Sequence, residues 1–240
     1  ATNLTDGTVY ASANAVAVSD GDVYVVGNEG SGSESVAKLW KNGVGVTLSN
    51  EDASYATANA VYVSENDVYV VGVESIGSKW ISKLWKNGEP MDLSDGLGYE
   101  KANDVYVEGN DIYVVGYKRN TSTTKIAKLW KNGVEVDLSD GTTRAEANAV
   151  AVLGNDVYVV GLERDGFQNV AKLWKNGEVT DLSDGTEDVE ANDIYVTDNG
   201  DVYIVGAANE KARLWVNGEI VDIGIDDAIE SAAYSVFVKE

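Results

Sequence analysis

The chain repeats one sequence of 44 or 45 residues five times. Residues 58–96, ANAVYVSENDVYVVGVESIGSKWISKLWKNGEPMDLSDG, align without a gap with residues 147–185, ANAVAVLGNDVYVVGLERDGFQNVAKLWKNGEVTDLSDG. The copies begin at Ala13, Ala58, Ala102, Ala147 and Ala191. A fixed period of this length is typical of an array of one supersecondary unit, usually a propeller or a solenoid, because a single unit cannot bury its own apolar faces.

The pattern inside each unit predicts β-strands, because apolar residues alternate with polar ones and Val, Ile, Tyr and Trp predominate. In the second unit we expect strands at residues 58–64, 68–74, 80–85 and 89–93. Asn-Gly separates the last two strands in all five copies, and this dipeptide favours a tight hairpin because both turn residues need positive φ. Such short connections make neighbouring strands antiparallel, which favours the four-stranded blade of a β-propeller over a parallel β-helix. No helix is expected, since no segment shows a sustained period of 3.6.

The units predict a single all-β domain over residues 1–240, a β-propeller with five four-stranded antiparallel blades. The unit boundaries are residues 13–57, 58–101, 102–146, 147–190 and 191–232. Spare terminal strands flank them: residues 1–12 contain the ending of a unit, and residues 233–240 match its opening. The alternatives are a six-bladed ring with an incomplete composite blade from the two termini, and exchange of a strand between chains. Asn at the opening of the five units, and not of the spare strand, favours five blades.

The charge of the chain narrows the classes of partner. With 18 basic and 40 acidic residues the net charge is −22, which repels phosphate backbones and anionic membrane surfaces, so no nucleic acid partner is expected. No run of 18 apolar residues occurs, so no membrane insertion is expected either. The chain has no Cys and no His, which removes disulfides, thiolate and imidazole catalysis and the usual zinc ligands. We expect no cofactor, no bound metal and a monomer.

The order ANAVxVxxxDVYVVG followed by AKLW resembles the β-propeller repeats of bacterial secreted and surface proteins, and more loosely the blades of NHL-type propellers. The resemblance covers nearly the whole chain and is specific for the fold. It implies a rigid, extracytoplasmic binding or spacing module without a shared catalytic motif. The near-uniformity of the units also fits an engineered or reconstructed repeat protein.

One Asn recurs at the opening of each inner strand and is a candidate ligand-binding residue. The five positions are Asn14, Asn59, Asn103, Asn148 and Asn192. In a ring, their amides could hold water, a cation or a polar ligand around a central channel. The structural alternative is that each Asn hydrogen-bonds the backbone of its own entry loop, as Asn does in turns.

Aromatic and basic residues supply the remaining candidates. A Trp recurs near the end of each third strand, and we expect these five side chains to pack between neighbouring blades rather than to stack on sugars. Trp80 breaks the repeat and follows a variable loop, which makes it the better candidate for an exposed contact. Tyr117 and Arg119 lie in the corresponding loop of the third unit and form a local basic and aromatic patch on an acidic molecule.

Repetition argues against catalysis, because an active site is asymmetric whereas every candidate carboxylate recurs around the array. The repeated Asp-Gly pairs lack the ligand spacing of a calcium loop and favour turns. The expected function is therefore a non-catalytic binding module that recognises a glycan or a protein through one face of the ring. A ligand-free structural or engineered scaffold is the alternative, and a hydrolase is the most remote of the three.

Overall fold

The computed structural model describes residues 3–31, 34–119, 124–221, 223 and 231–239. Within these ranges the chain forms twenty β-strands and no helix. The described part of the chain also holds no helix of the length and apolarity that crossing a bilayer requires.

The strands fall into five groups of four, one group for each repeat unit, although each inner strand begins two or three residues before its unit. We call each group a blade. The first two blades comprise β1 (Tyr10–Ser19), β2 (Asp22–Ser31), β3 (Glu34–Lys41), β4 (Val44–Thr47), β5 (Tyr55–Ser64), β6 (Asp67–Ile76), β7 (Lys79–Lys86) and β8 (Glu89–Asp92). The third comprises β9 (Glu100–Glu108), β10 (Asp111–Arg119), β11 (Lys125–Lys131) and β12 (Val134–Asp137). The last two comprise β13 (Ala145–Leu153), β14 (Asp156–Asp165), β15 (Gln168–Lys175), β16 (Glu178–Asp181), β17 (Val189–Val196), β18 (Val202–Ala208), β19 (Lys211–Val216) and β20 (Glu219–Val221).

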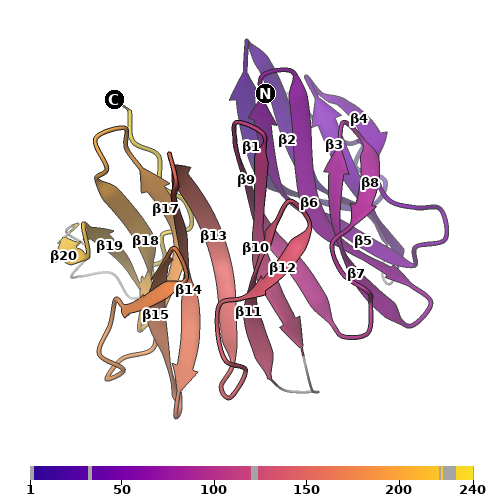
Figure 1. Ribbon diagram of the computed structural model, residues 1–240. Helices are drawn as coiled ribbons and strands as arrows, with labels where there is room; N and C mark the ends of the chain where they lie inside the picture. Colours follow the sequence, from indigo (N-terminus) through magenta and orange to yellow (C-terminus); the bar gives the residue numbers. More distant parts are fainter. Residues whose placement is uncertain (1–2, 32–33, 120–123, 222, 224–230, 240) are drawn as a thin grey trace. The chain divides into compact units, whose positions relative to one another are not determined.

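Strands that follow one another within a blade pair side by side, as β13, β14 and β15 do in Figure 1. The described pairings within blades are antiparallel, and one parallel pair, Ser35 with Tyr55, joins the first two blades into a single eight-stranded sheet. The predicted order of four antiparallel strands per unit is therefore confirmed. The inner strand of the second blade begins at Tyr55 rather than at the predicted residue 58, because Tyr55 still pairs with Ser75 of β6.

The Asn-Gly turns adopt the predicted backbone conformation, and each Asn side chain also fastens its blade. Asn87 has a φ of 53°, its Oδ1 accepts a hydrogen bond from the Val68 amide at 2.9 Å, and its Nδ2 donates to Asp67 Oδ1 at 2.7 Å. The Lys86 ammonium lies 2.6 Å from the other Asp67 oxygen and 5.1 Å from the centre of the Tyr69 ring. The first, third and fourth blades repeat this arrangement. Hydrogen bonds from Lys86 and Asn87 lower the pKa of Asp67.

A glycine in the second strand touches the backbone of the inner strand. A Cβ built on Gly161 would lie 2.0 Å from the carbonyl oxygen of Glu146, and the same close approach occurs at Gly27, Gly72 and Gly206. The inner strand bulges here, since the register shifts between Ala147 and Ala149. The bulge directs a carbonyl at the neighbouring strand, so the position admits no side chain.

The chain divides into two compact parts, and each has its own core. The first part comprises residues 1–107, 111–114 and 130–135, and the second comprises residues 108–110, 115–129 and 136–240. In the first part, Trp85 packs with Leu48 and Val26, and Trp130 packs with Leu93 and Val71 in a separate cluster. In the second part, the corresponding core gathers apolar residues of the fourth and fifth blades.

The expected spare strands are only partly strands. Residues 1–2 and 240 of these segments lie outside the described residues, and β1 begins at Tyr10. Residues 3–7 line a hollow beside Trp40, whose side chain is 3% exposed. Residues 231–239 form no strand, although they contact the fifth blade through several hydrogen bonds.

Candidate binding surfaces

The repeated Asn residues connect one blade to the next. The described hydrogen bonds run from an Asn Nδ2 to the carbonyl oxygen of the alanine that opens the following inner strand: Asn14 to Ala58 (2.8 Å), Asn59 to Ala102 (2.6 Å) and Asn148 to Ala191 (2.8 Å). Asn192 donates in the same way to Ala233 at 2.9 Å. The alternative in which each Asn binds its own entry loop is therefore wrong for these four residues, because the bulge after Ala58 and its counterparts turns the amide outward from its own blade.

In each of these contacts the Asn side chain uses its Nδ2 as the donor. Other polar atoms of the repeated Asn residues make further contacts. Asn14 Oδ1 accepts a hydrogen bond from Ser12 Oγ at 2.9 Å, while Asn14 Nδ2 also lies 3.1 Å from Thr57 Oγ1. Asn103 occupies the same register in β9 and is half-buried. A ligand that binds the repeated Asn residues would have to use the acceptor positions that remain on their Oδ1 atoms.

The five repeated Trp residues are core residues, as expected. Their exposed fractions are at most 3%, for Trp40, Trp85, Trp130, Trp174 and Trp215. Trp215 Nε1 donates to the carbonyl oxygen of Leu182, which lies in the preceding blade, at 3.1 Å. Side chains buried to this degree cannot serve as a sugar platform.

Trp80 stands in a different environment, between two tyrosines of the first compact part. Its ring centre lies 5.5 Å from that of Tyr55 and 4.7 Å from that of Tyr99, with tilts of 49° and 46°. Tyr55 pairs with Ser75 and Ser75 pairs with Trp80, so all three side chains project from the same face of the sheet. The small Ser75 between them allows the two large rings to approach each other. We call Tyr55, Trp80 and Tyr99 the aromatic cluster.

The aromatic cluster is partly packed against the protein and partly accessible to solvent. All three side chains are half-buried, and the neighbouring Leu97 is 82% exposed. Burial, and to a lesser degree the nearby Tyr99, raises the pKa of Tyr55, so its hydroxyl stays protonated at neutral pH and can donate a hydrogen bond. The cluster therefore offers apolar ring surface and hydroxyl groups together on a rigid sheet.

Tyr55 and Tyr99 were not predicted as site residues, although the sequence contains a pattern that points to them. Tyr10, Tyr55 and Tyr99 stand three residues before the Ala that opens the first three units, and Arg144 and Asp188 stand there in the other two. In the second blade, Tyr55 is also in register with a Trp two strands away, because Tyr55 pairs with Ser75 and Ser75 pairs with Trp80. The cluster depends on this coincidence, which the repeat alone does not reveal.

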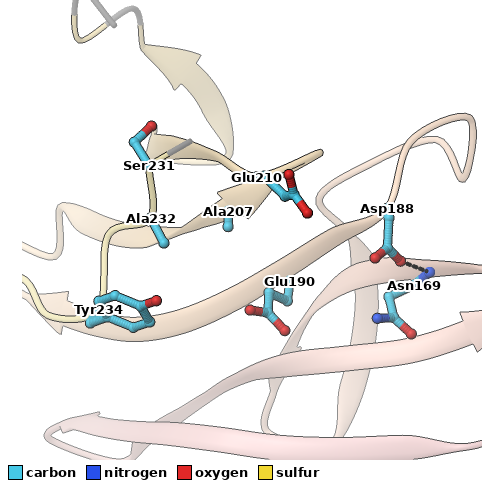
Figure 2. A pocket seen from close by; sticks show the side chains of 8 residues that line it. All are labelled: Asn169, Asp188, Glu190, Ala207, Glu210, Ser231, Ala232 and Tyr234. Atoms are coloured by element: carbon cyan, nitrogen blue, oxygen red, sulfur yellow. Dashed lines mark hydrogen bonds between the residues drawn. The ribbon is translucent and has the colours of Figure 1, made fainter. Parts of the chain in front are cut away.

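A second hollow lies in the second compact part and is acidic. It has a volume of about 430 Å³, and Figure 2 shows the carboxylates of Asp188, Glu190 and Glu210 around it, with Tyr234 at one side. The lining residues include no Lys or Arg, and the Asn169 amide donates to Asp188 Oδ1 at 2.8 Å. Burial raises the pKa of Glu190, and the charge of Asp188 adds to this effect. Such a site favours a hydrogen-bond donor or a cationic group.

Tyr117 and Arg119 do not form the expected exposed loop patch. Both belong to β10 rather than to a loop. Tyr117 is 6% exposed, and the Lys125 ammonium lies 3.8 Å from the centre of its ring. Arg119 is half-buried at the end of the same strand. Tyr117 is thus covered by the protein itself.

The Asp-Gly pairs form turns, as expected. Asp140 Oδ1 accepts a hydrogen bond from the Thr142 amide at 2.8 Å, and Gly141 has a φ of 74°. Asp6, Asp95 and Asp184 make the same contact two residues downstream. Among the described residues, no group of three acidic side chains has the arrangement needed to hold a metal ion.

Comparison with known proteins identifies the fold and leaves the family open. No family model matches the chain, and no curated protein sequence matches it. A chain of the nidogen/laminin complex is similar over 88% of this chain and 78% of its own length, with 9% identity and a TM-score of 0.52. A GH43 protein from Bacillus licheniformis gives 12% identity over 83% and 48% of the two chains, with a TM-score of 0.45. The GH32 β-fructofuranosidase of Bombyx mori, in complex with sucrose, gives 12% identity over 87% and 67%, with a TM-score of 0.40.

The first of these likenesses, together with five four-stranded antiparallel blades and no helix in the described residues, shows a five-bladed β-propeller fold. At 9% identity it shows the fold alone. The function of the chain therefore has to be argued from its own surfaces.

Proposed function

We propose that this protein is a non-catalytic binding module that recognises a glycan through the aromatic cluster. The observation that carries the proposal is the placement of Trp80 between Tyr55 and Tyr99, with ring centres 5.5 and 4.7 Å apart, on a face that the repeat does not generate elsewhere. Rings fixed in this way lose little conformational entropy when a ligand binds.

The chemistry of the cluster suits a sugar ring. The C–H groups of a pyranose pack against aromatic rings, while its hydroxyl groups accept and donate hydrogen bonds at the edges. The Tyr55 hydroxyl supplies such a partner, and so does the exposed side chain of Ser54, whose Oγ can still accept a hydrogen bond while it donates to the Ser75 carbonyl oxygen. A protein partner would use the same rings and the exposed Leu97, and is the second outcome that the experiment below can give.

The resemblance to bacterial secreted and surface propellers supports an extracytoplasmic or cell-surface location for such a module. A ligand-free scaffold, natural or engineered, is the competing function, and the near-uniformity of the five units supports it. A hydrolase would need a carboxylic acid with a raised pKa beside a second carboxylate, and the acidic hollow with Glu190 is where one would look for it.

The test is a glycan array followed by titration of the best oligosaccharide while tryptophan fluorescence is recorded. The five repeated Trp residues are buried, so Trp80 dominates any change in emission on binding. Trp80→Ala is expected to weaken binding at least tenfold, and Trp80→Tyr to restore part of it. Phe167→Ala is the matched control, because Phe167 is an isolated aromatic residue that is 93% exposed.

Three results would overturn the proposal. An array without signal at high protein concentration would favour the scaffold. Binding that Phe167→Ala weakens as much as Trp80→Ala would show that the cluster is not the site. Turnover of a glycoside substrate that disappears in Glu190→Gln would show an enzyme.

A further inference from the structure

Aromatic rings elsewhere in this protein are paired with an ammonium group. A Lys Nζ lies 3.8–5.1 Å from the ring centre of five tyrosines in β2, β6, β10 and β14: Tyr24, Tyr69, Tyr113, Tyr117 and Tyr158. A cation at this distance is attracted by the negative face of the ring. Within the described residues, no Lys or Arg takes this position over the ring of Tyr55 or Trp80. These two rings of the aromatic cluster are therefore not occupied by a cation of the chain itself.

The segments that carry the aromatic cluster are acidic. Residues 49–55, 75–81 and 94–101 contain four acidic and two basic residues: Glu51, Asp52, Asp95 and Glu100 against Lys79 and Lys101. Glu51 and Asp52 are exposed and lie in a turn that is held against β6, since the Ser54 amide donates to the Ser75 carbonyl oxygen at 2.9 Å. Ser75 is the residue that separates the two large rings in register. The turn therefore brings two carboxylates to the end of the blade where the rings lie.

The lysine next to Trp80 does not offset these charges at the rings. Lys79 precedes Trp80 in β7, and successive side chains of a strand project from opposite faces of the sheet. A Cβ built on Gly96 would lie 3.0 Å from Lys79 Cβ and 3.1 Å from Ile81 Cγ1, so Lys79 and Ile81 both face the turn that follows β8. Lys79 therefore lies on the face of β7 away from the aromatic cluster.

We propose that the glycan bound by the aromatic cluster carries a free amino group, which lies in its protonated form against the rings of Tyr55 and Trp80. The inference rests on the proposed function and adds the class of sugar to it. The ring faces supply the cation–π attraction, while the carboxylates of Glu51 and Asp52 and the net charge of −22 attract the ammonium group. An N-acetylated sugar lacks that charge, and a sialylated sugar is repelled. The aromatic cluster therefore ranks amine-bearing glycans above neutral ones, and neutral glycans above acidic ones.

The probes are two trisaccharides of glucosamine, one fully N-acetylated and one with free amino groups, and a sialylated trisaccharide as the acidic probe. Each is titrated against the intact protein while tryptophan fluorescence is recorded. We expect the amine form to bind at least about fivefold more tightly than the acetylated form, and the sialylated form to bind most weakly. Raising the ionic strength from about 0.05 M to about 0.5 M should reduce the preference for the amine form, because salt screens the carboxylates.

Changes on the protein side assign the preference to this site. Trp80→Leu keeps an apolar side chain without a ring face and should reduce the preference for the amine form to less than about twofold, whereas Trp80→Phe should keep most of it. Glu51→Gln combined with Asp52→Asn should weaken binding of the amine form at least about threefold and leave that of the acetylated form unchanged. Glu65→Gln is the matched control, because Glu65 is exposed in the turn at the other end of β5. It should leave the binding of both forms unchanged.

The outcomes separate this inference from the proposed function. If the acetylated or the sialylated trisaccharide binds as tightly as the amine form, and Trp80→Leu weakens that binding, the glycan module stands and the amine preference is wrong. A preference for the amine form that persists in Trp80→Leu would also overturn the inference, because the cation would then bind elsewhere on the acidic surface. Absence of binding by all three trisaccharides would overturn it as well, whereas the proposed function fails only if the whole glycan array gives no signal.

Discussion

The glycine of the second strand gives the sharpest test of the packing, because two arguments predict opposite signs for Gly161→Ala. Gly161 lies inside β14 without a positive φ, so alanine would ordinarily stabilise the strand by about 0.5–1 kcal/mol through the unfolded state. The structure predicts destabilisation instead. The added Cβ would lie 2.0 Å from the Glu146 carbonyl oxygen and 3.1 Å from Ala147 Cα, and both are backbone atoms.

The magnitude follows from that distance. Relieving the clash requires the two strands to move apart by more than about 1 Å, which breaks one or two ladder hydrogen bonds at about 0.5–1.5 kcal/mol each and adds the strain of overpacking, about 1–3 kcal/mol. We therefore expect Gly161→Ala to lower the free energy of unfolding by about 2–5 kcal/mol. The β1–β2, β5–β6 and β17–β18 pairs have the same geometry at Gly27, Gly72 and Gly206.

The assay is urea denaturation, followed by circular dichroism and by tryptophan fluorescence. Gly166→Ala is the matched control, because Gly166 lies in the turn after β14 with a φ of 59° and open space around it. It should cost only about 1–2 kcal/mol for left-handed backbone. If Gly161→Ala leaves the unfolding midpoint unchanged or raises it, the argument from close backbone approach is wrong.

Three further changes test the core, the contacts between blades and the buried charge. Trp130→Ala should lower the free energy of unfolding by about 3–5 kcal/mol because the indole is fully buried, and an unchanged denaturation midpoint would contradict this. Asn148→Ala removes the hydrogen bond to Ala191 and should cost about 0.5–1.5 kcal/mol in the same assay. Burial raises the pKa of Asp193, so its contribution to stability is present below the usual value of 3.8 and is lost as the pH rises through the folded pKa. Asp193→Asn should therefore be more stable than the parent at pH 7, and melting temperatures should converge near pH 4; a constant difference would refute the assignment.

The fold could be predicted from the sequence because its signals are local and repeated. Alternation of apolar residues placed the strands to within about three residues, and Asn87-Gly88 with its four counterparts fixed the hairpins. The burial of Trp85 and the other repeated indoles followed from the same regularity. Each of these features depends on residues close together in the chain.

The candidate surfaces could not be predicted as well, because they depend on register across strands. The aromatic cluster needs Tyr55 and Trp80 to meet across Ser75, and no local pattern states that pairing. The same limit explains the error at Tyr117, which is a buried residue of β10 with Lys125 of β11 over its ring. The Asn contacts were misassigned since the acceptor carbonyl lies 43 or 44 residues away.

The Asn contacts between successive inner strands have a mechanical consequence. A force applied along the chain would load these links one after another, so each blade could detach before its neighbour yields. Unfolding one unit of 44 or 45 residues would release about 150 Å of extended chain. A pulling experiment would then show evenly spaced rupture events, and removing one Asn would lower the force of a single event. The length of the molecule under load would therefore increase in equal steps, each step corresponding to the unfolding of one repeat unit.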